Sequence, residues 1–542
     1  MPKQRGHVTQ AVVESRLVEA DSGKTHGKRA PGPLSSYPFL LAVVIMSGAA
    51  LRLLSLLWGE PVYDELYTLW AARLPLDVLP QEVYASGHPP LYYLIGHYWF
   101  YPGAGYAWAG LVSWAAGVLS VPLAYLLGKE LFSRRAGLCA ALFVACSPLL
   151  ILYSANVTDY SFFGAAALAS FYFLARGIRR GGRRDWVGYT LFIAAAVFSH
   201  NLGLLLLAAE GVFFLLARRA GSPRLAVWLV SLVPVALLQA GWLLVNRGTP
   251  VATMGPHNPR LAELAEEAAR AILLMLFSDT GIDDSGLWWK TAALLAVLAG
   301  LAAAGGVRRV LAGRAWLALS AAFLIVTVGT VVLALTLSEP GIDSVSERYL
   351  VVAAPLLALL LAALLAAAPP PLRFAGVAAV VAFSLILFEA RTAERGDGFA
   401  PAMATVSREM QPGDKLLCFP VNHCYVAVAY YLEEAPPVSG GYIIVEEPGS
   451  VMFDGSTRGT WEGYRDVLSS ERKLYAGAGL EDKLSAEAAG AKRLWLLEGS
   501  ESGRGVIDSS MIYAALGKRW RVSGSWDFDA SYALTLYVPK ND

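Results

Sequence analysis

The chain has 542 residues, is 56% hydrophobic, and has a mean hydropathy of +0.48. A typical soluble domain is only about 45–50% apolar. Here apolar runs recur near the ~20 residues that a helix needs to cross the hydrocarbon core. The composition therefore excludes an ordinary soluble protein and predicts a multi-pass membrane protein. The formal net charge is only +1, so bulk charge points to no partner, and we expect no nucleic-acid ligand.

Residues 1–36 are polar and rich in Lys and Arg, without the apolar core and cleavage site of a signal peptide. We predict that they form a disordered cytoplasmic tail. The apolar segments that follow predict a transmembrane domain over 37–390, with roughly eleven helices. The predicted spans are 37–58, 106–128, 136–153, 160–176, 186–200, 202–217, 225–245, 287–306, 315–337, 349–368 and 374–390.

Arginines cluster in alternate loops between these spans, most densely between Arg176 and Arg184. Cytoplasmic loops are enriched in Lys and Arg, so we place the N-terminus inside and the C-terminus outside. The loop 59–105 then lies outside. Its short aromatic segment Leu91–Tyr101 predicts an interfacial helix, because a further span would put the arginines outside. The segment 260–278 is amphipathic and predicts a second surface helix.

The remaining residues, 391–542, change in character and predict a small periplasmic α/β domain. Strands are expected at Lys415–Pro420, Gly441–Val445, Arg493–Glu498, Trp520–Trp526 and Tyr532–Val538, and helices at Tyr425–Leu432 and Leu480–Ala489. The acidic triplet at Asp527 is interpreted as turn chemistry. Cys418 and Cys424 could form a disulfide outside the cytoplasm, and both the oxidised and the reduced form stay open.

Asp64 and Glu65 directly follow the first predicted span. Carboxylates beside apolar membrane segments are costly unless they are solvated, paired or used in chemistry. They also precede a helix-like run, where acids favour a helix start. From these residues alone, a helix N-cap or a solvated loop acid is the better interpretation for Asp64.

Several short elements occur in a fixed order along the chain. They are Asp64-Glu65, the His-Pro-Pro-Leu-Tyr-Tyr segment at His88, the turn Gly128–Gly137, the second outer loop Ser147–Tyr160, the Ser-His-Asn-Leu-Gly segment at His200, and, downstream, Arg348-Tyr349-Leu350 with Pro355. Through these elements, residues 52–203 resemble the GT-C superfamily of membrane glycosyltransferases, and most closely its protein mannosyltransferase-like branch with the bacterial lipid A aminoarabinose transferases. One departure lies in the second outer loop, where Asn156 and Thr158 replace the Glu and Arg of many relatives. Asp159 is then the acid of that loop.

The resemblance implies transfer of a sugar from a polyprenyl-phosphate donor to an acceptor hydroxyl. Asp64 is the expected base, and Glu65 either orients it or starts the helix. Asp159 is the expected second catalytic carboxylate, which supports the sugar or a cation, or instead caps the fourth span. A divalent cation between Asp64 and Asp159 is one open alternative, and no other cofactor is expected.

The departing lipid phosphate needs cations or hydrogen-bond donors. Arg348 is the best candidate because arginine binds phosphate with two parallel hydrogen bonds, although it could instead pair with Glu347. His88 and His200 could donate to phosphate, bind a metal, or be structural. Arg52 lies inside the first span and either faces a polar cavity or reaches the surface. The expected substrate-binding set is completed by Tyr63, Tyr92, Tyr153 and Glu347.

The expected function is therefore a glycosyltransferase of a bacterial inner membrane, with its site on the periplasmic face. Its expected partners are a polyprenyl-phosphate-linked sugar, membrane lipid, and an acceptor glycan, lipid or protein. Two alternatives stay open. A transporter or flippase predicts buried acids, broken helices and repeats. A non-catalytic member would bind a glycan or partner without needing Asp64.

Overall fold

The computed structural model describes residues 37–100, 105–218, 224–247, 261–277, 305–337, 347–393, 399–419, 431, 442–444, 490–499, 509–528 and 532–540. The chain divides into a short first unit, Met1–Val43, and a second unit, Val44–Asp542. All the candidate site residues discussed below lie in the second unit.

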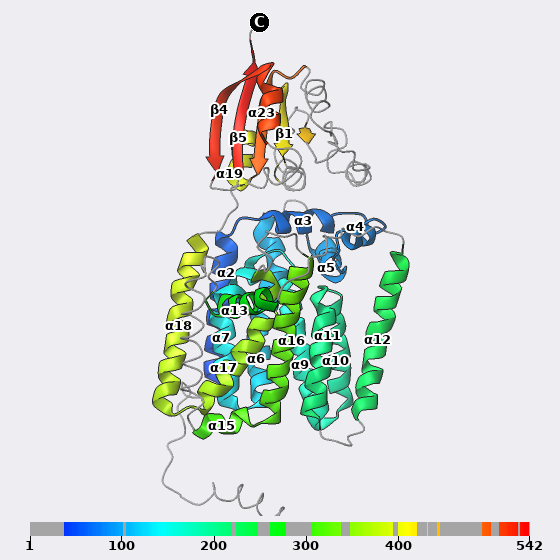
Figure 1. Ribbon diagram of the computed structural model, residues 1–542, viewed down its shortest axis with the longest axis vertical. Helices are drawn as coiled ribbons and strands as arrows, with labels where there is room; N and C mark the ends of the chain where they lie inside the picture. The colour runs from blue at the N-terminus through cyan, green and yellow to red at the C-terminus, as the bar shows by residue number, and fades with distance from the viewer. Residues whose placement is uncertain are drawn as a thin grey trace, which may run out of the picture. The chain divides into compact units, whose positions relative to one another are not determined.

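Most of the described chain before residue 394 is helical (Figure 1). The longer helices are α2 (Tyr37–Trp58), α6 (Gly105–Leu131), α9 (Tyr160–Arg180), α12 (Arg224–Val245), α16 (Arg314–Leu337) and α18 (Pro370–Ala393). The shorter ones are α7 (Arg134–Cys146), α8 (Pro148–Ala155), α10 (Arg183–Val197), α11 (Leu202–Ala217), α13 (Leu261–Phe277), α15 (Gly305–Leu311), the 3₁₀ turn η2 (Glu347–Leu350) and α17 (Ala353–Ala367).

Five of the described helices are long and apolar enough to cross a membrane, or six if α7 and α8 form one bent span. The helices α11, α17 and α18 contribute further apolar stretches of 10–17 residues. The fold is thus helical with several candidate spans, as predicted. The count of roughly eleven spans stays a prediction, and the predicted span 287–306 lies almost wholly outside the described residues.

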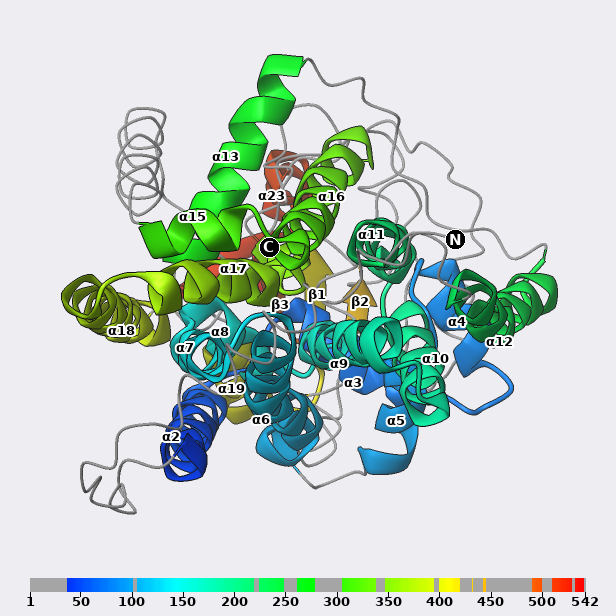
Figure 2. The ribbon, with the colours of Figure 1, turned by 90° about the horizontal axis from the view of Figure 1, so that it is seen from below.

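The helices α6, α7 and α9 form the packed centre of the described helices. Helix α6 packs against both α7 and α9, and α10 packs on the other side of α9 (Figure 2). Gly137 on α7 permits the close approach to α6, because a Cβ there would lie 2.5 Å from the Tyr125 carbonyl oxygen. Glycine supplies the space that a backbone needs when it comes this close to another helix.

The predicted span 136–153 is in fact two helices, α7 and α8, which bend by 57° at Ser147. Pro148 is the cause, because it has no N–H to donate to the carbonyl of Val144. Arg52 on α2 supplies the missing donors. Its Nη2 donates to the Val144 oxygen at 2.8 Å and its Nη1 to the Ala145 oxygen at 2.9 Å.

Arg52 is completely buried, and its remaining hydrogen bonds are also within the protein. Nε donates to Ser154 Oγ at 3.1 Å, and Nη1 also donates to the Gly48 carbonyl at 3.1 Å. The guanidinium thus sits at the C-terminal end of α7, where the helix dipole favours a cation. The structure shows neither predicted alternative for Arg52, a polar cavity or the surface: its hydrogen bonds hold the broken helix.

The loop 59–105 folds into three short helices, α3 (Tyr63–Ala72), α4 (Leu79–Ala85) and α5 (Leu91–Trp99). Helix α5 has nine residues and is about 14 Å long at 1.5 Å per residue, too short to span a bilayer core of about 30 Å. This length agrees with the predicted interfacial helix. Helix α13 covers most of the second predicted surface helix and runs across the direction of the longer helices in both views (Figures 1 and 2).

The C-terminal residues contain a five-stranded sheet in the order β2-β1-β3-β5-β4. The strands are β1 (Asp414–Phe419), β2 (Tyr442–Ile444), β3 (Arg493–Gly499), β4 (Trp520–Phe528) and β5 (Tyr532–Pro539). β1 pairs in parallel with β2 and β3, whereas β3–β5 and β4–β5 are antiparallel. Apolar side chains of α19 (Phe399–Glu409) pack with one set of strand residues, and those of α23 (Ser509–Gly517) with the other.

All five predicted strands are present, with ends shifted by a few residues. The two predicted tail helices lie almost wholly outside the described residues, as does Cys424, so the disulfide stays a prediction. Asp527 lies near the end of β4 rather than in a turn, and Asp529 is outside the described residues. Whether this region is a separate periplasmic domain stays a prediction.

Candidate functional site

Asp64 and Arg348 form an ion pair between two segments that are 284 residues apart in the chain. Asp64 lies in the first turn of α3, and Arg348 lies in η2. Arg348 Nη1 donates to Asp64 Oδ2, and both side chains are about one-third exposed, at 33% for Arg348 and 39% for Asp64. Asp64, the predicted base, and Arg348, the predicted phosphate partner, are therefore in contact with each other and accessible to solvent.

Arg348 keeps unused hydrogen-bonding capacity in this position. Its Nε is buried and has no hydrogen-bond partner among the described residues. Its guanidinium carbon lies 5.2 Å from the centroid of the Tyr349 ring. Burial acts to lower the pKa of Arg348, but Asp64 and neighbouring tyrosines raise it on balance. Arg348 is thus a fixed cation with a spare donor, which suits it to bind an anion.

Glu65 is fully buried and acts as a junction between three segments. Its Oε2 accepts the Val62 N–H at 2.8 Å, which satisfies a free donor at the start of α3. Its Oε1 accepts the Tyr106 hydroxyl at 2.7 Å and the Val157 N–H at 2.6 Å. These contacts support both predicted roles of Glu65, which are to start the helix and to fix the geometry near Asp64. We therefore treat Glu65 as a positioning residue.

The end of the second outer loop, from Ala155 to Asp159, is held by further buried hydrogen bonds. Tyr106 donates to the Ala155 carbonyl at 3.1 Å, and Ser113 Oγ donates to the Thr158 carbonyl at 3.0 Å. The Tyr92 hydroxyl lies 2.7 Å from Ser113 Oγ. Tyr92 was predicted to bind substrate, but it is 1% exposed. Its contacts are those of a residue that supports the loop.

Asp159 closes this loop at the start of α9 and is buried, at 7% exposure. It occupies the N-cap position, yet its side chain makes no capping hydrogen bond to α9. Its Oδ2 is buried without a hydrogen-bond partner among the described residues. Burial raises the pKa of the Asp159 carboxyl to about 8, and the Asp64 charge adds to the shift while Arg348 opposes it. The capping alternative is therefore not supported by this geometry.

His200 lies among aromatic rings beside Arg348. Its ring stacks on Phe163 at 5.2 Å and lies 5.4 Å from Tyr160 and 6.2 Å from Tyr349. Burial lowers the pKa of His200 to about 3, with help from His88 and Arg348. Nδ1 accepts the Leu202 N–H at 3.1 Å, so the neutral ring carries its proton on Nε2. His200 can donate a hydrogen bond but does not carry a charge near neutral pH.

The other predicted substrate residues are placed as follows. His88 is half-buried between Tyr67 and Tyr93, and burial lowers its pKa. Tyr153 is buried, and its hydroxyl donates to Glu347 Oε1 at 3.5 Å, so Glu347 faces Tyr153. The side chain of Tyr63 is outside the described structure.

A cation between Asp64 and Asp159 would need several side chains that can act as metal ligands. Within the described ranges, no three His, Cys, Asp or Glu side chains lie close enough together to hold a metal ion. Asp64 instead has a guanidinium partner. The cation between Asp64 and Asp159 stays a prediction, and no step below depends on one.

Tyr106 and Ser113 belong to the site but could not be found from the sequence. Both lie on α6 and hold the loop that carries Asp159. They are ordinary residues within an apolar segment, and only the packing of α6 against α8 and α9 brings them to this loop. The family-like elements predicted Asp64, Asp159, His200 and Arg348 as site residues. Asp64 and Arg348 form the partly exposed ion pair, and Asp159 and His200 are buried.

A family match and a shared fold show what this chain is similar to. A family model described as dolichyl-phosphate-mannose-protein mannosyltransferase matches residues 88–242, which include His88, Asp159 and His200. The fold is shared over 92% of this chain with ArnT from Cupriavidus metallidurans. The predicted resemblance to the GT-C superfamily of membrane glycosyltransferases is thereby confirmed.

The individual relatives share little sequence identity with this chain. ArnT from Cupriavidus metallidurans in the apo state gives a TM-score of 0.56 at 14% identity, covering 92% of this chain and 97% of ArnT. The same protein bound to undecaprenyl phosphate gives 0.55 at 13% identity, covering 91% and 97%. YkcB of Bacillus subtilis strain 168, named as a provisional mannosyltransferase, is 24% identical over 256 residues. That match spans 45% of this chain and 34% of YkcB.

Proposed function

We propose that this protein transfers a sugar from a polyprenyl-phosphate donor to an acceptor hydroxyl. The observation that carries the proposal is the exposed Asp64–Arg348 pair beside the buried Asp159 carboxyl. Asp64 supplies a base, and Arg348, in direct contact with it, supplies an anion-binding group. Support also comes from the fold shared with ArnT, which has been seen with undecaprenyl phosphate bound.

The proposed reaction is a displacement at the anomeric carbon of the donor. The acceptor oxygen forms a bond to this carbon while the bond to the phosphate oxygen breaks. The Asp64 carboxylate takes the acceptor proton, and the polyprenyl phosphate leaves with both electrons of the broken bond. Negative charge on Asp64 also favours the positive charge that develops on the sugar ring.

The leaving phosphate needs groups that hold its charge, and Arg348 is the proposed one. When a phosphate oxygen takes Nη1 or the free Nε of Arg348, the guanidinium is drawn from Asp64, which is then free to accept a proton. His200 Nε2–H and a protonated Asp159 are neutral donors for the phosphate or for the sugar. Donor binding and activation of the base are thereby linked through one arginine.

The proposed location is a bacterial inner membrane, with the site and the C-terminal residues on the periplasmic side. The arginine-rich loops and the acids occupy opposite ends of the predicted spans, which supports this orientation. The acceptor is proposed to be a hydroxyl-bearing glycan, lipid or protein, and the donor sugar a pentose or a hexose.

A transporter is the main alternative, because α7–α8 is a broken helix and Glu210 on α11 is a buried acid. In transporters, the freed carbonyls of such breaks coordinate the ion. Here Arg52 takes the carbonyls of Val144 and Ala145. One oxygen of Glu210 accepts the Ser170 hydroxyl at 2.5 Å, and the other has no hydrogen-bond partner among the described residues. The occupied carbonyls at the break favour the transferase.

The direct test is a reconstituted reaction with polyprenyl-phosphate sugars and candidate acceptors. We expect polyprenyl phosphate to be released in a one-to-one ratio with the glycosylated acceptor. A transporter would instead move the intact donor between leaflets without releasing the sugar. Translocation of intact donor with every acceptor class left unmodified would contradict the proposal.

A further inference from the structure

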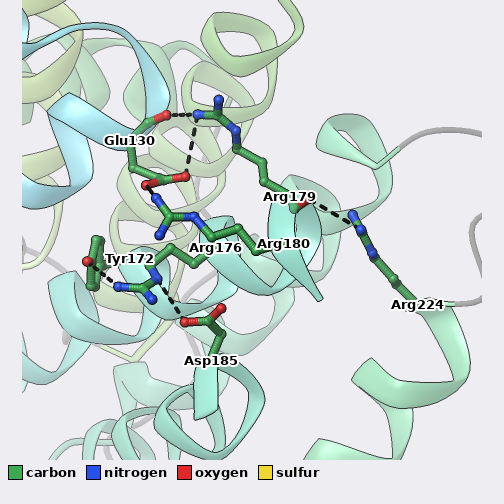
Figure 3. A network of polar contacts seen from close by, with 7 residues as sticks. All are labelled: Glu130, Tyr172, Arg176, Arg179, Arg180, Asp185 and Arg224. Carbon is green, nitrogen blue, oxygen red and sulfur yellow. Dashed lines mark hydrogen bonds and ion pairs between the residues drawn. The ribbon is translucent and has the colours of Figure 1, made fainter. Parts of the chain in front are cut away.

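A second charged site lies where the ends of α6 and α9 meet the starts of α10 and α12. We call it the arginine surface, and it consists of Arg179, Arg180, Arg183, Arg184 and Arg224. Figure 3 shows Arg179, Arg180 and Arg224 converging on this corner from α9 and α12, with Glu130 of α6 between the first two.

The acidic side chains at this corner are largely buried and already form ion pairs with arginines. Glu130 is 9% exposed, and its carboxylate is contacted by Arg180 Nη2 at 2.6 Å and by Arg179 Nη1 at 3.5 Å. Asp185 is 5% exposed and pairs with Arg176 Nε at 2.8 Å. The arginines of the surface stay accessible, with Arg179 60% and Arg180 55% exposed. The outer side of the corner is therefore strongly positive.

The excess of positive charge is unfavourable at the start of α10 when no ligand is bound. Arg183 and Arg184 are its first two residues, both exposed and without an ion-pair partner in the described part of the chain. The N-terminus of a helix already carries partial positive charge, so cations there are unfavourable. The N-cap residue, Gly182, makes no side-chain capping bond. Asp185, the acid of this first turn, is buried and paired with Arg176, so an added anion at the exposed Arg183 and Arg184 would be favourable.

The position of the surface indicates which anion. Helices α9 and α12 are both long and apolar enough to cross a membrane, and the surface lies at the end of one and the start of the other. The arginines are then at the level of the lipid headgroups. Arginine binds phosphate with paired hydrogen bonds, and each basic residue near an anionic membrane surface adds about 1 kcal/mol of attraction.

We propose that the arginine surface is a binding site for the phosphate headgroup of an anionic membrane lipid. The lipid phosphate would lie against the first turn of α10, between Arg183 and Arg184 and the exposed sides of Arg179 and Arg180. It would join α10 to the ends of α9 and α12, which Arg224 already links by donating to the Arg179 carbonyl at 3.3 Å. The proposal does not depend on the proposed sugar transfer.

The test uses the full-length protein in neutral detergent and the double variant Arg183→Gln/Arg184→Gln. The matched control is Arg308→Gln/Arg309→Gln, which removes an equally exposed arginine pair from α15. Binding of short-chain phosphatidylglycerol is measured against phosphatidylcholine and inorganic phosphate, with the unfolding temperature as a second readout.

We expect the wild type to prefer phosphatidylglycerol over both other probes and to be stabilised by it. The affinity should fall about fivefold for each arginine removed from α10, and change less than twofold in the control. Without lipid, the α10 variant should unfold at or above the wild-type temperature, because two cations leave a helix N-terminus. Equal losses in both double variants, equal stabilisation by inorganic phosphate, or a lower unfolding temperature without lipid would each overturn the proposal.

Discussion

The two aspartates of the proposed site differ because their surroundings differ. Asp64 is partly exposed and ion-paired, whereas Asp159 is buried with an unpartnered Oδ2. Burial of a carboxyl favours its neutral form, and an ion pair favours the charged form. We therefore infer that Asp64 serves as the base and Asp159 as a neutral hydrogen-bond donor, which refines the role first predicted for Asp159.

This difference predicts an alkaline limit to activity. The pKa of Asp159 is raised to about 8, so the donor is present below this pH and is lost as the pH rises through it. In the Asp159→Asn variant, the side-chain amide would keep an N–H donor at every pH. We expect kcat/KM of the wild type to fall above about pH 8, and the variant to lack that fall. A pH–rate profile of both proteins makes the comparison, and an unchanged alkaline limb in the variant would contradict the role.

Arg52 predicts a loss of stability rather than of catalysis. Replacing it by Met leaves the Val144 and Ala145 carbonyls unpaired in an apolar setting, at about 1–3 kcal/mol each. Arg52→Met should therefore lower the unfolding temperature strongly in detergent, and Arg52→Lys should lie between it and the wild type. Ser154→Ala removes the Nε acceptor together with the hydrogen bonds of the Ser154 hydroxyl to the Leu150 carbonyl and to Ser161, and should cost about 1–3 kcal/mol. A Met variant as stable as the wild type would refute the structural role.

At the scale of elements, the second outer loop is the part that the buried network holds in place. Glu65, Tyr106 and Ser113 bind the backbone of this loop at Val157, Ala155 and Thr158. The loop in turn carries Asp159. A small displacement of such a support can reduce a rate substantially, since catalysis depends on the placement of groups to a fraction of an ångström.

We predict that Tyr106→Phe reduces kcat about tenfold to hundredfold while the protein stays folded. It removes one hydroxyl that donates to Glu65 and to the Ala155 carbonyl. Glu65→Gln should have a similar effect, because both changes weaken the same junction. Steady-state kinetics on the two variants and on their combination tests this. A combined loss equal to the product of the single losses would show that the two residues act separately.

The element pattern also shows what hydropathy can predict. The ends of α2 and α11 agree with the predicted spans 37–58 and 202–217, because long apolar runs mark them directly. The break at Pro148 was missed, since the apolar run continues through it and Arg52, the residue that stabilises it, lies 92 residues away from Val144. The helix-like run after Asp64 and Glu65 corresponds to α3, whereas the short helix α4 was missed, because the loop 59–105 has mixed polarity.

For the whole molecule, the site depends on long-range pairing that no local pattern contains. Asp64 and Arg348 were each singled out through family-like motifs, and both were placed on the outer side by the arginine distribution. Their direct contact could not be predicted, because it requires the packing of η2 relative to α3. The same holds for the Tyr92 hydroxyl, whose position beside Ser113 makes it a support for the loop.

The proposed orientation predicts the outcome of reporter fusions. A reporter that is active only outside the cytoplasm should be active after residue 542 and inactive after Gly182, within the arginine-rich turn between α9 and α10. The charge distribution is the physical reason, since basic loops are retained in the cytoplasm. Activity at both positions, or at Gly182 alone, would contradict the orientation and the periplasmic site with it.

The most direct measurement is the comparison of Asp64→Asn with the wild type in two assays, sugar transfer and binding of undecaprenyl phosphate. Asp77→Asn is the matched control, as an exposed acid of the same outer segment. We predict that Asp64→Asn lowers the transfer rate about 10²–10⁴-fold. It should also tighten phosphate binding about twofold to fivefold, because Arg348 loses a partly exposed competitor worth up to ~1 kcal/mol. Asp77→Asn should change neither. A folded Asp64→Asn protein that transfers sugar at the wild-type rate would contradict the proposed function.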